Sequence, residues 1–258
     1  MTWVVPGVLV YADGGGDYPI NCDVICNNSL GGCSPLSAGE VTCFQDCTGR
    51  RPAGLVPCLA LHGDPLAAHF TVMARLESAS VHSFRHLGRE VSAHGAPSRL
   101  VRSAKRAARE EVRHARAAGA LARRHGGRPN PPEVESGPIR DLETIATENA
   151  TEGCVREAFG ALVACWQAKA AADPVVRATM KRIAGDETRH AALALQIDGW
   201  LSGRLLPTAR ARVDQARRAA LADLAASVAE APAALRRPLG LPTASQSHFL
   251  QQQIAALA

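Results

Sequence analysis

Two glutamates and two histidines occur in one repeated pattern, Glu-x-x-His, at Glu111–His114 and at Glu187–His190. Both pairs lie in stretches whose apolar residues return every three or four positions, as on the buried side of an amphipathic helix. A spacing of three places the two side chains on one helix face, about 5–6 Å apart at Cβ. A carboxylate and an imidazole held in this way can bind a metal ion together.

Two further helical stretches each carry a glutamate on their apolar side. In the first this residue is Glu77. In the third, the apolar side reads Ile145, Glu148, Glu152, Val155, Phe159, Leu162 and Trp166. Spacing favours Glu152 as the inward carboxylate there, and Glu148, one turn earlier on the same face, is an extra or alternative candidate. Each of the four stretches therefore directs a carboxylate inward near its middle.

Buried carboxylates need a counter-charge. An isolated ionised group in a protein interior costs more than the spare stability of a domain, so it is paired or bound to metal. No arginine or lysine lies on the four apolar stripes, whereas arginines are frequent on their flanks. The sequence therefore predicts divalent cations at the level where the glutamates and histidines meet.

Breaker residues divide the chain into segments. Residues 64–204 hold four helical stretches of similar length, at 65–94, 98–125, 141–172 and 173–202, joined by short connections except at 126–140. This layout predicts an all-α, antiparallel four-helix bundle. Residues 1–63 form a Cys-rich, loop-rich segment, and residues 205–258 form a C-terminal helix, at 207–230, and a tail.

The ordered set Glu77, Glu111-x-x-His114, Glu152, Glu187-x-x-His190 resembles the ligand set of the ferritin-like di-iron and di-manganese carboxylate superfamily, of the rubrerythrin and bacterioferritin type. The resemblance covers about half of the chain. It implies two iron ions, or alternatively manganese or a mixed pair. Glu77, Glu111 and His114 would hold one ion, and Glu152, Glu187 and His190 the other, with Glu111 and Glu187 bridging.

Acidic residues also precede both ligand pairs. Glu110 and Asp186 each sit four residues before a ligand histidine, so either could accept its second imidazole N–H and fix the tautomer. The alternative is that both are solvated surface acids.

Such a centre suits dioxygen or peroxide chemistry, because hard oxygen donors stabilise a higher-valent metal. The first expectation is an oxidase or oxygenase of a small organic substrate, supplied by an external electron donor since the C-x-x-C pairs of an attached rubredoxin are missing. The alternatives are iron storage of bacterioferritin type and manganese catalase-like peroxide dismutation. A disulfide-rich head and a long tail favour a monomer or dimer over a storage cage.

Six cysteines lie in one stretch rich in Gly, Asn, Ser and Pro: Cys22, Cys26, Cys33, Cys43, Cys47 and Cys58. This density predicts about three disulfides and an oxidising, periplasmic or extracellular, compartment. Zinc is the rival interpretation, although no histidine lies among these cysteines. The first residues make a poor signal peptide, because they are short, contain Pro6 and lack a basic start.

The net charge of +5 hides a division between an acidic N-terminal segment and a more basic remainder. A basic body can attract nucleic acid or acidic membranes, but no aromatic stacking platform is visible. The arginines are therefore interpreted as the solvated faces of helices, with no nucleic-acid partner expected. No apolar run is long enough for a membrane span.

Overall fold

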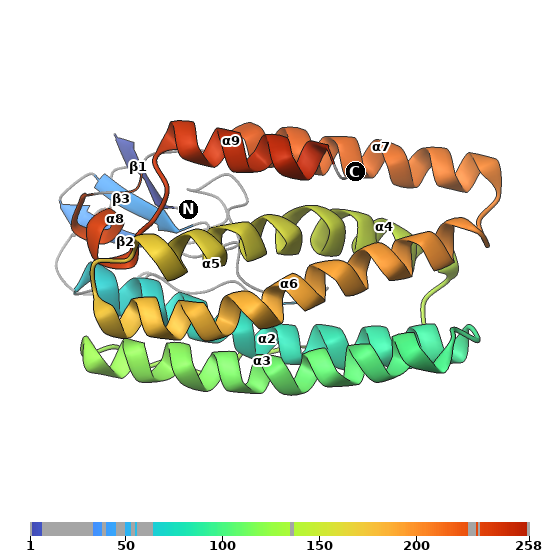
Figure 1. Cartoon of the computed structure of the whole chain (residues 1–258), viewed down its shortest axis with the longest axis horizontal. Helices are drawn as coiled ribbons and strands as arrows, with labels where there is room; N and C mark the ends of the chain where they lie inside the picture. The colour runs from blue at the N-terminus through green and yellow to red at the C-terminus, as the bar shows by residue number, and fades with distance from the viewer. Residues whose placement is uncertain are drawn as a thin grey trace, which may run out of the picture.

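The computed structural model of the chain describes residues 2–6, 33–37, 40–44, 50–52, 55, 64–134, 137–226, 231 and 233–256. Helices form the body of the molecule and lie side by side along its length (Figure 1). The prediction of a helical bundle is confirmed for this body. In the described part of the chain, no helix is both long enough and apolar enough to cross a membrane.

Three of the four long rods of the bundle are single α-helices: α2 (Pro65–Ala93), α3 (Ser98–Arg124) and α6 (Pro174–Ser202). The helices α2 and α6 begin in the same way. An aspartate, Asp64 or Asp173, accepts hydrogen bonds from two backbone N–H groups of the first turn, and a proline follows it. Both devices satisfy or remove donors that a helix leaves unpaired at its start.

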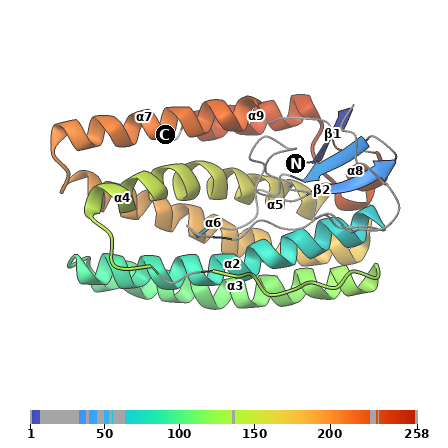
Figure 2. The ribbon, with the colours of Figure 1, turned by 180° about the vertical axis from the view of Figure 1, so that it is seen from behind.

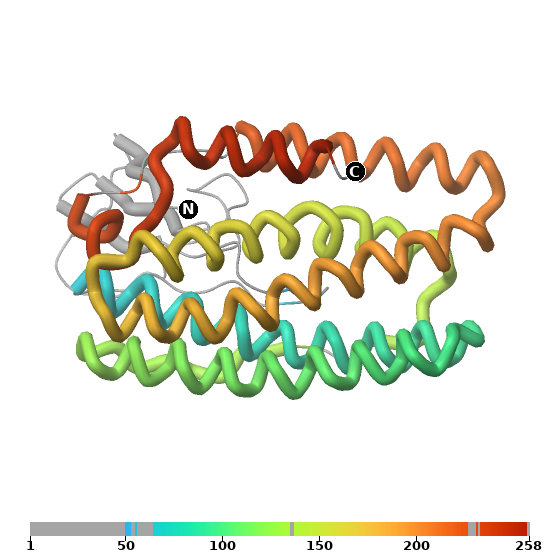
Figure 3. The backbone as a smooth tube through the Cα atoms, viewed as in Figure 1, coloured from blue at the N-terminus to red at the C-terminus, as the bar shows by residue number. Residues whose placement is uncertain are grey.

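The other rod is continuous but changes its hydrogen-bond pattern. It consists of α4 (Leu142–Glu148), the π-helix η1 (Asn149–Glu157) and α5 (Ala158–Ala170). Figure 3 shows the rod passing from one to the next without a break. A π-helix closes its hydrogen bonds over five residues instead of four, and such segments are frequent at functional sites.

The rods pack as two antiparallel pairs, α2 with α3 and α5 with α6, and α3 lies beside α6 (Figure 1). The long connection after α3 runs back along α2 and α3 to the start of α4 (Figure 2). Arg75 of α2 holds it by donating a hydrogen bond to the carbonyl oxygen of Pro131 (3.2 Å). Because of this crossover, the third rod has the direction of α3 and is antiparallel to α6.

Three helices follow the bundle: α7 (Pro207–Ala226), α8 (Ala233–Leu239) and α9 (Ala244–Ala255). The helices α7 and α9 cover the third rod, and α8 packs against α2 and α6. The predicted helix at 207–230 corresponds to α7. Apolar residues of α7 and α9 pack against Val155 and Phe159 of the third rod. The C-terminal region is therefore attached along the bundle.

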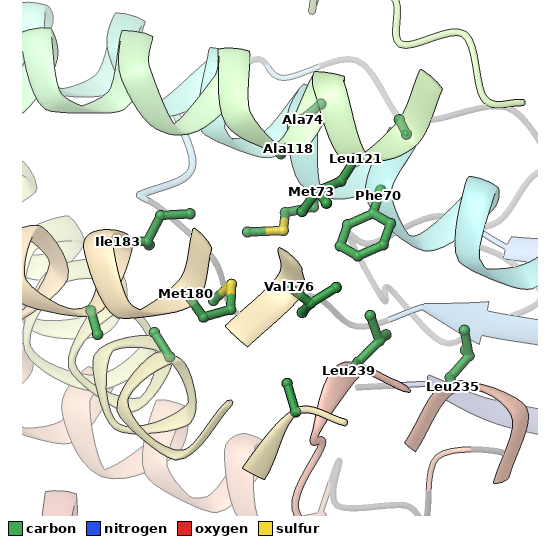
Figure 4. Close-up of a cluster of buried hydrophobic side chains, with 14 of the residues drawn as sticks. Phe70, Met73, Ala74, Ala118, Leu121, Val176, Met180, Ile183, Leu235 and Leu239 are labelled. Carbon is green, nitrogen blue, oxygen red and sulfur yellow. The ribbon is translucent and has the colours of Figure 1, made fainter. Parts of the chain in front are cut away.

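Apolar clusters fill the two ends of the bundle. At one end, side chains from α2, α3, α6 and α8 meet around Phe70, Met73, Met180 and Leu239 (Figure 4). At the other, Phe84, Leu87 and Leu100 pack with residues of α4 and α6. The glutamates and histidines of interest lie on each helix between the stretches that supply these two clusters.

In the N-terminal segment, β1 (Thr2–Pro6) and β2 (Cys33–Ser37) both pair antiparallel with the central strand β3 (Glu40–Phe44). The Gly, Asn, Ser and Pro residues of this segment predict irregular, loop-rich structure, and this prediction is wrong at the three strands, which are short enough to fit between such residues. Cys33 and Cys43 are register partners in the β2–β3 pair. Cys22, Cys26, Cys47 and Cys58 lie outside the described residues, so the disulfides remain a prediction.

Candidate metal centre

Carboxylates and imidazoles from four rods meet in the middle of the bundle. One group consists of Glu77, Glu111, His114 and Glu187, and the other of Glu111, Glu157, Glu187 and His190. In each group, one potential ligand atom per residue lies within 4.8 Å of the others, and every member is buried. Glu111 and Glu187 belong to both groups, so they are placed to bridge two ions. Five of the six residues singled out from the sequence are thus brought together.

The sixth, Glu152, is not among them. The third rod contributes Glu157, whose side chain is fully buried. Glu152 is partly exposed and pairs with Arg156, with Nε and Oε1 3.2 Å apart. The choice of Glu152 from spacing is therefore corrected to Glu157, and Glu148 also lies outside both groups.

The error has a physical cause in the third rod. Val155 and Phe159, with Leu162 and Trp166 beside them, pack against α7 and α9 rather than into the bundle. The strongest apolar stripe therefore marks a second interface. In addition, η1 spreads its turns over more residues, which breaks the 3.6-residue phase carried forward from Ile145. The inward face after η1 bears small residues instead, such as Ala164.

Glu148 belongs to a buried ion-pair chain that the sequence did not reveal. Its Oε1 lies 3.2 Å from Nε of Arg50, and its other oxygen contacts Arg140. Arg140 also grips Glu90 through Nε (2.6 Å) and Nη2 (2.7 Å). Arg50 is 1% exposed and donates from Nη1 to Asn149 of η1 (3.1 Å). No periodicity could have found Arg50, since it precedes the helices.

Arg140 and Glu148 of this series of ion pairs also border a pocket. Arg140, Glu148 and Glu152, together with Thr147 and Thr151, line a space of about 670 Å³ beside α4 and η1. Glu152, which spacing favoured, and the alternative candidate Glu148 therefore line this pocket, whereas Glu157 belongs to the cluster inside the bundle.

The acids next to the ligand pairs hold the histidines, but across helices. Nε2 of His190 on α6 donates to Oε2 of Glu110 on α3 (2.9 Å), and Nε2 of His114 on α3 donates to Oδ2 of Asp186 on α6 (3.1 Å). The expectation of a bond within one helix is corrected, because each imidazole points at the neighbouring helix. A carboxylate can only accept, so each bond fixes a proton on Nε2 and makes Nδ1 the atom that can bind a metal in place of a proton.

Around these bonds, the atoms that face the centre lack partners. Several buried atoms have no hydrogen-bond partner among the described residues. They are the two carboxylate oxygens of each of Glu77, Glu111 and Glu157, Oε1 of Glu187, and Nδ1 of His114 and of His190. His114 Nδ1 lies 3.1 Å from Glu187 Oε1, and His190 Nδ1 lies 3.1 Å from Glu111 Oε1, but neither contact has hydrogen-bond geometry. Buried polar atoms are rarely left in this state.

Proton affinities reflect the crowding. Burial, with the charge of Glu111, raises the pKa of Glu77 well above its usual value. Burial likewise raises the pKa of Glu157 to about 8, against the opposing effect of His190. For Glu111, burial is outweighed by contacts with His114 and His190, which lower its pKa to about 2. Contacts with the carboxylates likewise overcome burial and raise the pKa of both histidines. In the protein without metal, protons take the place of cations.

The residues fit a pair of divalent ions. Removing a charge from water costs several kcal/mol per ion, so four buried carboxylates would cost about as much as a whole domain's stability, roughly 5–15 kcal/mol. Two divalent cations would balance Glu77, Glu111, Glu157 and Glu187, and the unpaired oxygens and Nδ1 atoms would become ligands.

Comparisons of the chain with protein-family models, with curated proteins and with solved structures give no match. The fold and the centre define the class: an all-helical bundle with two overlapping, buried groups of glutamates and histidines that could hold metal ions.

Proposed function

We propose that the chain is a ferritin-like protein that binds two iron ions in the bundle and activates dioxygen or peroxide, as an oxidase or oxygenase of a small organic substrate. The observation that carries the proposal is the convergence of buried, unpaired oxygen and nitrogen atoms from four rods on one place. One glutamate from each of two rods and a Glu-x-x-His pair from each of the other two is the di-iron and di-manganese ligand set.

In this function Glu77, Glu111 and His114 hold one ion and Glu157, Glu187 and His190 the other, with Glu111 and Glu187 shared. The bound iron ions supply the redox chemistry toward dioxygen or peroxide.

The chain's own residues orient and shield the centre. Glu110 and Asp186 fix the histidine tautomers through their 2.9 Å and 3.1 Å bonds. Phe84 packs on His190, with ring centroids 4.9 Å apart, and apolar clusters lie beyond the centre on both sides. A site walled in this way keeps bulk water from reactive species. An external donor supplies electrons.

Metal analysis and gas exchange test the proposal. Protein loaded anaerobically with Fe(II) should hold two ions per chain and consume dioxygen when exposed to air. The variant Glu111→Gln/Glu187→Gln should lose both ions. Asp214→Asn, which removes an exposed carboxylate on α7, is the control and should behave as the parent.

Other outcomes select other functions. Many iron ions per chain, in a large symmetric shell, would support storage instead. Dioxygen release from hydrogen peroxide by the manganese-loaded protein, without turnover of the iron-loaded one, would support peroxide dismutation. Failure to bind any transition metal would exclude all three.

A further inference from the structure

The outer surface of α3 is basic along its whole length. Its exposed cations are Arg99, Arg102, Lys105, Arg106, Arg109, Arg113, Arg116, Arg123 and Arg124, here called the α3 basic face. The acids of α3, Glu110 and Glu111, are both buried. A helix of this length spans about 40 Å. The face therefore forms a long stripe of positive charge without an exposed carboxylate on its own helix.

Within the described residues, the stripe stays open to solvent. The helix α3 packs against α2 and α6 and lies along one edge of the bundle in both views (Figures 1 and 2). Arg106 and Arg113 are more than half exposed, at 57% and 58% of their side chains. On α6, the exposed Arg189 donates to Glu110 of α3 (2.8 Å) and extends the positive surface.

Most cations of the α3 basic face lack an acidic partner. Arg106 and Arg113 pair with Glu110, and Arg124 pairs with Asp173, whereas the other six have no carboxylate partner within the described residues. Like charges one turn apart destabilise a helix, and the α3 basic face carries such pairs repeatedly. An acidic partner that docks there would relieve the repulsion.

Position links the face to the metal centre. Arg106 Nε and Arg189 Nη2 both donate to Oε1 of Glu110 (2.8 Å each), whose other oxygen accepts from Nε2 of His190. A single buried carboxylate thus separates exposed guanidinium groups from an imidazole of the centre.

The second half of the centre has the same arrangement. Arg113 Nη2 donates to Oδ2 of Asp186 (3.0 Å), and the same oxygen accepts from Nε2 of His114 (3.1 Å). Arg189 also contacts Asp186, so it joins the two halves. Each histidine of the centre is therefore connected to exposed arginines through one carboxylate, which accepts hydrogen bonds from both.

We propose that the α3 basic face is the docking surface for an acidic electron-carrier protein that reduces the dinuclear centre. The inference rests on the proposed function. Each encounter moves one electron: the carrier is oxidised, one Fe(III) becomes Fe(II), and no covalent bond forms or breaks. Two encounters reduce both ions.

The face fits a protein partner better than other polyanions. α3 contains no aromatic residue to stack on bases. None of the large apolar side chains exposed in the described residues belongs to α3, so the face has no anchor for a lipid surface. Charge complementarity mainly accelerates encounter, by about 10–1,000-fold at low salt.

The test measures how fast a reduced acidic [2Fe–2S] ferredoxin reduces the di-ferric protein in stopped-flow. Arg102→Glu/Arg109→Glu/Arg116→Glu reverses the face without touching the groups that bind Glu110 or Asp186. Its second-order rate constant should fall at least about tenfold at low salt. The parent's rate should fall as salt rises, because added ions screen exposed charges.

The matched control, Lys169→Glu/Arg210→Glu/Arg218→Glu, changes the net charge equally on α5 and α7 and should stay within about twofold of the parent. If the first variant folds poorly, Arg102→Gln/Arg109→Gln/Arg116→Gln should show a smaller loss of the same sign. Equal rates for the α3 and control variants would overturn the docking inference.

Two further measurements separate the possibilities. Iron content is determined first: a parent without two ions refutes the proposed function, whereas two ions with rates indifferent to the face refute the docking inference alone. Duplex DNA and anionic phospholipid vesicles are then titrated. If reversal of the face abolishes binding to either one and leaves ferredoxin reduction unchanged, the face belongs to that polyanion and the inference is wrong.

Discussion

The exchange of Glu157 for glutamine is the most direct probe of the centre. It tests whether the third-rod ligand is Glu157, as the structure indicates, or Glu152, as sequence spacing predicts. Glu157 belongs to one of the two groups only, so Glu157→Gln leaves that group with Glu111, Glu187 and His190. At an effective dielectric constant of about 20, unit charges about 4 Å apart attract by about 4 kcal/mol. Loss of this charge should weaken one ion by about 1,000-fold in Kd.

Glu152→Gln is the matched control from the same helix. Its carboxylate is partly exposed and pairs with Arg156, so its loss should change neither Kd by more than about threefold. Titration with Co(II) or Fe(II) under anaerobic conditions, followed by absorption and by metal analysis, gives the two affinities. Glu157→Gln should bind one ion tightly and one weakly, and Glu152→Gln should bind two.

Stability without metal gives an independent readout. Burial raises the pKa of Glu157 to about 8, so at pH 7 the ion-free protein holds this carboxyl group in its neutral form. Glutamine has the same size and is neutral, and the Tm of the ion-free variant should match that of the parent. Weak binding by Glu152→Gln together with two tight ions in Glu157→Gln would refute the assignment of the third rod.

Three further outcomes are expected. Asp186→Asn removes the acceptor of the His114 imidazole bond and should lower metal affinity by about 10–100-fold, as measured by chelator competition; unchanged affinity would contradict the role of this bond. Gly153→Ala places a Cβ 2.8 Å from Arg50 Nη1 and should destabilise the protein by about 1–3 kcal/mol in urea unfolding, whereas Gly185→Ala, with open space around it, should not. Burial raises the pKa of Glu148, but Arg50 and Arg140 outweigh it and lower the pKa below the usual 4.5. The stability that this group contributes is therefore present above pH 4.5 and lost below it. The free energy of unfolding of Glu148→Gln should fall less than that of the parent between pH 6 and pH 3.5, and parallel losses would contradict the pairing.

Periodicity predicted the three uninterrupted helices and their inward residues. Glu77, Glu111 and Glu187 were found because each helix keeps one phase from end to end, so that a glutamate in register with apolar neighbours must be buried. The two histidines followed from the same phase. This reasoning needs only that the helix is regular and that its apolar stripe has one partner.

The third rod meets neither condition. Its apolar stripe around Phe159 faces the C-terminal helices, and η1 shifts the phase before Glu157 is reached. One sequence signal was present: Glu157 is followed at helical spacing by Ala161, Ala164 and Ala168, small residues that suit a crowded bundle interior. This alanine stripe can be recognised as the inward face only after the apolar stripe around Phe159 is assigned to the contact with the predicted helix at 207–230.

Long-range ion pairs were beyond reach for a different reason. Arg50 and Arg140 lie outside the helices that they serve, and nothing in local spacing tells which carboxylate an arginine of a connecting segment will meet. The premise that the buried acids lack basic partners holds for the central glutamates, but not for Glu90 and Glu148.

Arg50 connects the segment before the bundle to both α2 and the third rod. Its side chain fills the space left by Gly153, and its carbonyl oxygen accepts a hydrogen bond from Ser80 of α2 (3.0 Å). A fragment trimmed to begin at Asp64 would keep every helix of the bundle and yet lose the wedge that steadies the π-helical turn carrying Glu157. We therefore expect a fragment that keeps Arg50 to be more stable than one that begins at Asp64.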